Sequence, residues 1–248
     1  MRLLALTYLV TAHLLLWGCA LKKTDKPQPE PNTAVLIFSK TSGFHHESIP
    51  AGIRAIRALG QAHGFQVDTT TNAQLFTAAS LGRYQAVVFL STTQDVLNEE
   101  QQRAFEQYIR GGRGFVGIHA ATDTEYDWPW YGQLVGAYFN GHPAVQLATV
   151  SVPGNAHPAT TGLPARWQRT DEWYNFRNIN PNLTVLATLD ESTYSGGTNG
   201  PDHPVAWYHE FDGGRAFYTA GGHTNESFDE PLFRQHLLGG IQYALGKK

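Results

Sequence analysis

The chain has 248 residues, of which 42% are hydrophobic and 16% are charged, and its formal net charge is −3. This length suits one globular domain with a large core, and the slight negative charge argues against nucleic acid as a partner, because nucleic-acid-binding domains carry basic surfaces. Cys19 is the only cysteine, which excludes an internal disulfide and a CxxC metal or redox pair.

The N-terminal stretch MRLLALTYLVTAHLLLWGCA has one early basic residue and then an apolar run, a pattern that predicts an export signal. Its end, LWGC, resembles a bacterial lipobox, in which cleavage frees Cys19 to carry lipid. A plain membrane anchor is the alternative, since about 18 apolar residues can span a bilayer. We expect a signal peptide over 1–18, lipidation at Cys19, a polar proline-rich tether over 19–33, and an exported lipoprotein held to the bacterial cell envelope by its lipid.

Strands and helices are predicted to alternate in the first half of the domain. Apolar runs predict strands at 34–40, 65–71, 84–91 and 114–119, and amphipathic patterns predict helices at 48–64 and 97–112, the second with Asn98 as its N-cap. This alternation predicts a parallel sheet with helices on both faces.

The second half of the chain is predicted to be richer in strands. A glycine-punctuated helix is expected at 132–141, strands at 145–152, 183–189, 204–211 and 215–221, and a closing helix at 230–245. The fold class is therefore α/β, with a mostly parallel central sheet and additional strands in the C-terminal half.

Polar residues gather where the predicted strands end, and loops at the carboxyl ends of parallel strands build the sites of such folds. His46 follows the first strand, His119 and Asp123 follow the fourth, and His223 follows the last, while Glu172 comes from a separate loop. Imidazole titrates near neutral pH and is the commonest metal ligand, so His119 is interpreted as a metal ligand or an acid–base group, against the alternative of a structural histidine.

Five motifs together identify a family resemblance: TSGFHHESI, GFVGIHAATDT, WYGQLVGAYFNGHP, DEWYNF and PVAWYHEFDGGRAFYTAGGHT. In this order they resemble the ThuA-like family, named for a trehalose-utilisation protein. The resemblance implies a flavodoxin-like three-layer domain over 34–246, related to class I glutamine amidotransferases. Their nucleophile is a cysteine in a G-x-C-x-G turn, and here His119 takes its place between Gly117 and Ala121, so amidotransferase chemistry is excluded. His46 matches the family histidine of the first loop.

The candidate site residues fall into three groups. The expected catalytic residues are His119, His46, Glu172 and Asp123. Three histidines, His46, His119 and His223, would with a carboxylate suit one Zn²⁺, Mn²⁺ or Ni²⁺ ion, although no H-x-H or H-E-x-x-H spacing is present and the ligands must converge from separate loops. No P-loop or dinucleotide turn is present, so no nucleotide cofactor is expected.

Aromatic residues near the same loops suggest a sugar ligand, because sugars offer apolar C–H faces for stacking. Trp130, Tyr131, Trp173 and Tyr174 are the candidates, and the alternative is that these aromatics complete the core.

The resemblance implies carbohydrate catabolism, often beside sugar dehydrogenases, which makes 3-keto-glycosides plausible substrates. In an eliminative cleavage, His119 or His46 would be the base, Glu172 the acid, and His223 a ligand or electrophile. The alternatives are a noncatalytic carbohydrate-binding lipoprotein and a conventional glycoside hydrolase with Glu172 and Asp123 as its two carboxylates.

Overall fold

The computed structural model describes residues 33–154 and 156–247. Its first half alternates strands and helices as predicted. The elements in chain order are β1 (Ala34–Phe38), α1 (Ile49–His63), β2 (Gln66–Thr70), η1 (Ala73–Leu75), α2 (Ala78–Leu81), β3 (Ala86–Leu90), α3 (Glu99–Arg110), β4 (Gly114–Ile118), η2 (His119–Thr122) and α4 (Pro129–Val135).

The second half is rich in strands, as expected. Its elements are β5 (Tyr138–Phe139), β6 (Gln146–Ser151), β7 (Arg166–Asp171), β8 (Phe176–Arg177), β9 (Thr184–Asp190), η3 (Glu191–Thr193), β10 (Pro204–Phe211), β11 (Gly214–Thr219), α5 (Asn225–Asp229) and α6 (Pro231–Ala244).

Local sequence explains where the two long N-terminal helices begin and end. Helix α1 has a proline in its first turn and ends at Gly64, whose φ of 73° is a left-handed conformation that glycine adopts without strain. Helix α3 begins with a capping box: the Asn98 side chain accepts from the backbone N–H of Gln101, and the Gln101 side chain accepts from that of Asn98. The N-cap predicted at Asn98 is confirmed.

One predicted helix is shorter than expected. The helix predicted over 132–141 is α4, which ends before Gly136, and Gly136 has a φ of 97°. The chain then forms the short strand β5, which pairs with β8. The left-handed turn at Gly136 stops the helix, because a residue in that conformation cannot continue the right-handed path.

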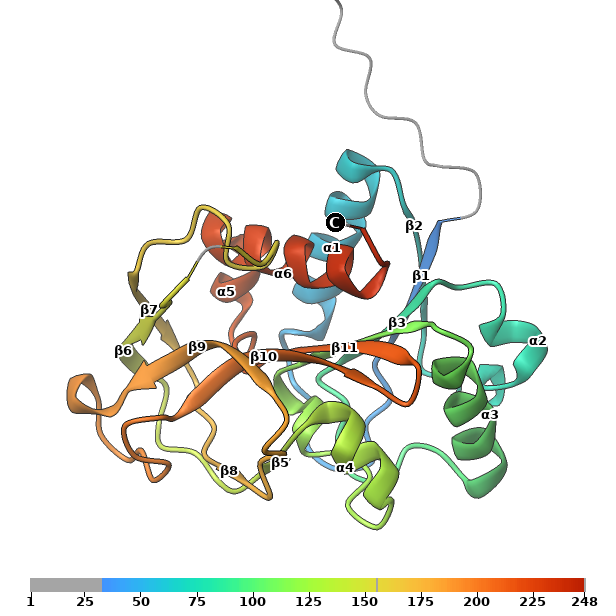
Figure 1. Ribbon diagram of the computed structural model, residues 1–248, viewed down its shortest axis with the longest axis horizontal. Coiled ribbons are helices and arrows are strands. Elements are labelled where there is room, and N and C mark those ends of the chain that lie inside the picture. Colours follow the sequence, from blue (N-terminus) through green and yellow to red (C-terminus); the bar gives the residue numbers. More distant parts are fainter. Residues whose placement is uncertain (1–32, 155, 248) are drawn as a thin grey trace, which may run out of the picture.

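Nine strands form one sheet in the order β2-β1-β3-β4-β11-β10-β9-β6-β7. The first five strands of this order are parallel, which is the 2-1-3-4-5 arrangement of flavodoxin-like folds with β11 as the fifth strand. The remaining strands add in antiparallel fashion. Helices α1, α5 and α6 cover one face and α2, α3 and α4 cover the other (Figure 1). The expected three-layer α/β fold with extra C-terminal strands is confirmed.

The sheet brings the ends of four separated strands to one edge. Ile118 at the end of β4 is level with Leu90 of β3 and Thr219 of β11 in the pairing register. From β11 to β7 each pairing is antiparallel, so the four successive reversals make β7 run in the same direction as β11. The carboxyl ends of β1, β4, β7 and β11 therefore face the same side of the molecule.

Three features predicted near the N-terminus concern residues that the structure does not describe. The signal peptide at 1–18, the lipidation residue Cys19 and all of the tether except Thr33 lie outside the described residues. Within the described part of the chain, no helix has the length and apolar character needed to cross a bilayer.

Candidate metal centre

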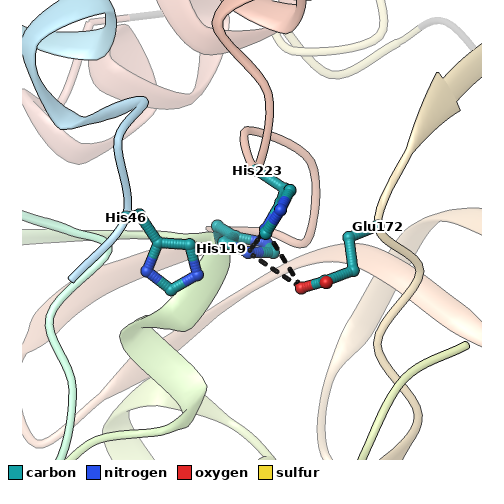
Figure 2. Close-up of side chains that lie close together, drawn as sticks. All are labelled: His46, His119, Glu172 and His223. Atoms are coloured by element: carbon teal, nitrogen blue, oxygen red, sulfur yellow. Dashed lines mark hydrogen bonds and ion pairs between the residues drawn. The ribbon is translucent and has the colours of Figure 1, made fainter. Parts of the chain in front are cut away.

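Four side chains from four strand ends meet at the carboxyl edge of the sheet. His46 comes from the loop after β1, His119 directly follows β4, Glu172 directly follows β7, and His223 follows β11. Each offers a ligand atom, and these atoms all lie within 4.8 Å of one another (Figure 2). We call these four residues the histidine cluster. Their convergence follows from the shared direction of the four strands.

His119 stands at the centre of the cluster in an unusual backbone conformation. Its φ is 52°, a left-handed value that is uncommon for residues other than glycine, and its side chain is fully buried. Nδ1 lies 2.8 Å from the carbonyl oxygen of Ala220. Because a carbonyl only accepts, Nδ1 donates to it, and Nε2 points into the cluster, where it is the atom that a metal ion would bind.

The remaining distances around Nε2 are short. His119 Nε2 lies 3.2 Å from Nδ1 of His223 and 3.6 Å from Oε2 of Glu172, and His223 Nδ1 lies 3.1 Å from the same carboxylate oxygen. The ring of Tyr174 packs against that of His119, with 4.3 Å between the two centroids.

The protonation states in the cluster follow from burial and mutual charge. Burial, together with the neighbouring His119 and His223, lowers the pKa of His46 to about 3, so His46 is neutral. Burial alone would raise the pKa of Glu172, but hydrogen bonds and charge from His119 and His223 outweigh it and hold this pKa at about 2. The hydrogen bond to Glu172 raises the pKa of His223 against the opposing effect of burial.

Asp171 holds two of the cluster residues in place. One of its oxygens accepts from the backbone N–H of Glu172 at 2.9 Å and from that of His223 at 3.0 Å. The other accepts from the N–H of Gly222 and the hydroxyl of Ser227, both at 2.8 Å. A single buried carboxylate thus joins the end of β7 to the loop after β11. This network fixes the positions of Glu172 and His223 before any ligand arrives.

The donor set fits a divalent transition metal. Metal–nitrogen distances of about 2.0–2.1 Å in a tetrahedral site imply ligand atoms about 3.3–3.4 Å apart, and the three distances among His119, His223 and Glu172 are 3.1, 3.2 and 3.6 Å. Nδ1 of His46 is buried without a hydrogen-bond partner among the described residues. Such an orphaned buried nitrogen costs free energy unless something binds it.

Asp123 lies outside the cluster. Its carboxylate accepts from the Tyr126 hydroxyl at 2.6 Å and from the Gln94 side chain at 3.1 Å. Burial raises the pKa of Asp123, although both hydrogen bonds oppose this shift. The carboxylate is therefore committed to the loops after β3 and β4, whereas Glu172 is directed at the histidines.

Only one of the four predicted substrate-binding aromatics touches the cluster, and that residue is Tyr174. Tyr131 is fully buried. Trp173 is 1% exposed, and its indole N–H donates to the carbonyl of Gln146. Trp130 donates to Asp212 in the turn before β11, at the opposite edge of the sheet from the cluster. The assignment of Trp130, Tyr131 and Trp173 to ligand stacking is corrected: these rings complete the core and its margins, which was the alternative account.

His142 is a site residue that sequence reasoning missed. Its Nδ1 lies 3.0 Å from Oε1 of Glu172, the carboxylate oxygen not shared with His119 and His223. The same Nδ1 lies 3.0 Å from the carbonyl of Pro143. Both partners are acceptors, so Nδ1 is the donor. The only sequence signal was its membership of the motif WYGQLVGAYFNGHP.

The chain matches the model of a protein family, ThuA, described as trehalose utilisation, over residues 34–244. The chain belongs to the ThuA family. The expected family resemblance is thereby confirmed, and with it membership of a carbohydrate-related family. A comparison with curated proteins gives no significant match.

Solved structures of ThuA-like proteins share the fold. One from Bacteroides uniformis is 24% identical, with 90% of this chain and 95% of that chain covered and a TM-score of 0.76. One from Parabacteroides merdae is 21% identical, with 89% and 91% covered and a TM-score of 0.73. A β-galactosidase from Bacillus circulans sp. alkalophilus is 14% identical, with a TM-score of 0.59, and the match covers 88% of this chain but 32% of that enzyme. At these identities the similarities establish the fold alone.

Proposed function

We propose that this ThuA-family protein is a metal-dependent enzyme that cleaves or modifies oxidised glycosides, with 3-keto-glycosides as the substrate class. The observation that carries the proposal is the histidine cluster, in which three imidazoles and one carboxylate bring their donor atoms within 4.8 Å of one another. Structural ion pairs rarely need three converging histidines, whereas Zn²⁺, Mn²⁺ and Ni²⁺ are bound by such sets.

The residues of the cluster are suited to hold the metal rather than to exchange protons. The Nδ1 of His119 donates to the carbonyl of Ala220 and so directs Nε2 into the cluster, and burial keeps His46 neutral. Glu172 stays ionised because its pKa is about 2, which supports a ligand role and argues against the earlier expectation that Glu172 is the general acid. His142 holds the second oxygen of Glu172 and so orients the carboxylate.

The chemistry of a bound metal supports an oxidised sugar as the substrate. A divalent metal bound here would supply a Lewis acid that polarises a carbonyl oxygen, and a keto group is what distinguishes an oxidised glycoside from an ordinary one. Family membership in trehalose utilisation supports the carbohydrate class. The two-carboxylate hydrolase is less well supported, because Asp123 is bonded to Tyr126 and Gln94 and Glu172 is surrounded by imidazoles.

The location of the protein is part of the proposal. The apolar N-terminal run ending in LWGC supports export and lipid attachment at Cys19, and the polar segment that follows would tether the domain at the cell envelope.

The proposal is tested by metal analysis followed by a substrate screen. The purified domain from residue 20 onward is incubated with Zn²⁺, Mn²⁺ or Ni²⁺, dialysed and assayed for bound metal, and we expect about one ion per chain. The loaded protein is then given 3-keto-glucosides and the matching unoxidised glucosides, and we expect turnover of the keto compounds only. Sugar binding without metal or turnover would replace the enzyme by the carbohydrate-binding lipoprotein, and metal-free hydrolysis of ordinary glycosides would favour the two-carboxylate hydrolase.

A further inference from the structure

Phe44 is the most exposed large hydrophobic side chain in the described residues, with 64% of its surface open to solvent. Phenylalanine is among the residues most often buried, yet this one stands open to solvent two residues before His46. The ring centroids of Phe44 and His46 are 4.8 Å apart, at an interplanar angle of 81°. An open aromatic ring therefore stands directly beside the histidine cluster.

The backbone that carries Phe44 is fixed. The hydroxyl of the fully buried Thr93 donates to the carbonyl of Phe44 at 3.0 Å and accepts from the N–H of Gly43 at 3.1 Å. The N–H of Ser42 donates to the carbonyl of Thr93 at 2.9 Å. A Cβ at Gly43 would lie 2.6 Å from Cγ of Gln94, so this close approach requires glycine. The loop after β1 is thus clamped to the loop after β3, and the backbone that carries the ring is held in place.

The polar surroundings of Phe44 define the ligand that fits it. The accessible side chains of the cluster and its neighbour are His223, 24% exposed, and His142, 40% exposed. Aromatic stacking needs an apolar face, while imidazole and carboxylate groups need hydroxyl or carbonyl oxygens. A pyranose ring meets both needs, because its axial C–H bonds form an apolar face and its oxygens project from the rim. An acyclic polyol lacks the face.

We propose that Phe44 is the platform on which the pyranose ring of the substrate stacks while its oxygens reach the histidine cluster. The assignment rests on the proposed sugar-processing function and specifies which ring-binding residue that function uses. Phe44 would thus provide the stacking surface that the sequence suggested for Trp130, Tyr131 and Trp173. Because the backbone at Phe44 is already held in place, binding a ring there orders less of the chain than binding on a free loop would.

The test compares Phe44→Ala and Phe44→Tyr with Leu147→Ala, which removes another exposed apolar side chain, 56% exposed on β6. The probes are methyl β-D-glucopyranoside and the acyclic polyol sorbitol, each titrated by NMR against the zinc-incubated domain. An aromatic contact is worth about 0.5–1.5 kcal/mol, so we expect Phe44→Ala to weaken glucoside binding about 3- to 10-fold and Phe44→Tyr to restore it. Leu147→Ala should bind as wild type does, and sorbitol binding should not depend on residue 44.

Two further measurements separate the platform from the rest of the proposal. Zinc content and thermal midpoint should be unchanged in Phe44→Ala, because Phe44 is neither a ligand nor buried. Wild-type glucoside affinity in Phe44→Ala would overturn the platform while leaving the metal centre intact. Glucoside binding that depends on Phe44 in a protein that holds no metal would overturn the metal-dependent enzyme and support the platform. A wild-type protein that holds zinc but binds no glucoside would overturn the platform, and the metal-dependent enzyme would still be judged by its turnover of keto compounds.

Discussion

Replacing His119 with asparagine perturbs the histidine cluster at its most constrained point. His119 has a φ of 52° and is fully buried, and its Nδ1 bonds the carbonyl of Ala220 at 2.8 Å. Asparagine tolerates the left-handed conformation better than alanine does. Its amide nitrogen occupies nearly the position of Nδ1 and can donate to the same carbonyl. His119→Asn therefore removes Nε2, the atom that faces the cluster, with little change to the turn.

The expected effect on metal-dependent stability can be worked out. A ligand present at 100 times its Kd stabilises the folded state by about 2.7 kcal/mol, which raises the thermal midpoint of a domain of this size by about 5–10 °C. Loss of a supporting partner already costs a metal site about 10–100-fold in affinity, and loss of a ligand should cost at least about 100-fold. At the same metal concentration, zinc should then stabilise His119→Asn by only about 0.4 kcal/mol, which raises its thermal midpoint by about 1–2 °C.

The assay measures thermal midpoints with and without zinc at 100 times the wild-type Kd. The matched control is His236→Asn. His236 is also buried, with 2% of its surface exposed, and its Nδ1 lies 2.8 Å from the carbonyl of Ala159, but it lies outside the cluster. The control should be destabilised but should keep the full zinc-dependent rise. If zinc raised the thermal midpoint of His119→Asn as much as that of wild type, or did not raise that of wild type at all, the reasoning would be refuted.

Three further predictions concern the support of the cluster, pH and the anchor. In Asp171→Asn one of the two accepting oxygens becomes an NH2 donor, while Arg169 keeps its second carboxylate partner, Glu230, at 2.9 Å. The free energy of unfolding should therefore fall by about 1–3 kcal/mol and zinc affinity by about 10–100-fold, measured by denaturant titration and metal competition. Unchanged zinc affinity would show that Asp171 does not position the ligands. Burial lowers the pKa of His236 to about 4, so between about pH 6.5 and 4 the folded state binds fewer protons than the unfolded state. The free energy of unfolding should therefore fall by up to about 3 kcal/mol as pH falls through that window. Denaturant titrations at pH 7 and 4.5 should show a smaller loss of stability for His236→Asn than for wild type, and equal losses would contradict this account. Cys19→Ala should abolish labelled fatty-acid incorporation in the full-length chain while leaving the melting of the domain unchanged, and persistent labelling would argue against lipidation.

The sequence by itself determined most of the sheet. Apolar runs marked β1, β3 and β4 because strands covered on both faces must be apolar throughout. Strand β7 was not predicted, although it alternates strictly between exposed and buried positions. Its buried positions hold Trp167, Arg169 and Asp171, and two inward charged residues conceal the hydrophobic alternation on which prediction depends. Helices α2 and α5 are too short to give a periodic signal.

The candidate site divides in the same way between sequence and tertiary structure. Chain order and strand direction led us to expect His46, His119 and His223 near one another, because residues after parallel strands share an edge. Glu172 was expected from a separate loop, and only the unpredicted strand β7 explains how it reaches the same edge. Their hydrogen-bond partners come from distant segments, such as Ala220 for His119 and Glu172 for His223. No periodicity encodes a hydrogen bond between distant loops.

The aromatic residues show the limit most clearly. Sequence proximity to polar loops suggested ligand contacts for Trp130 and Trp173, yet the first bonds Asp212 at the far edge of the sheet and the second is buried. Phe44 and His142 were given no role, although one is exposed beside His46 and the other reaches Glu172. A pattern of residue types predicts which face of an element is buried, but whether a ring fills the core or lines a site depends on which distant segment packs against it.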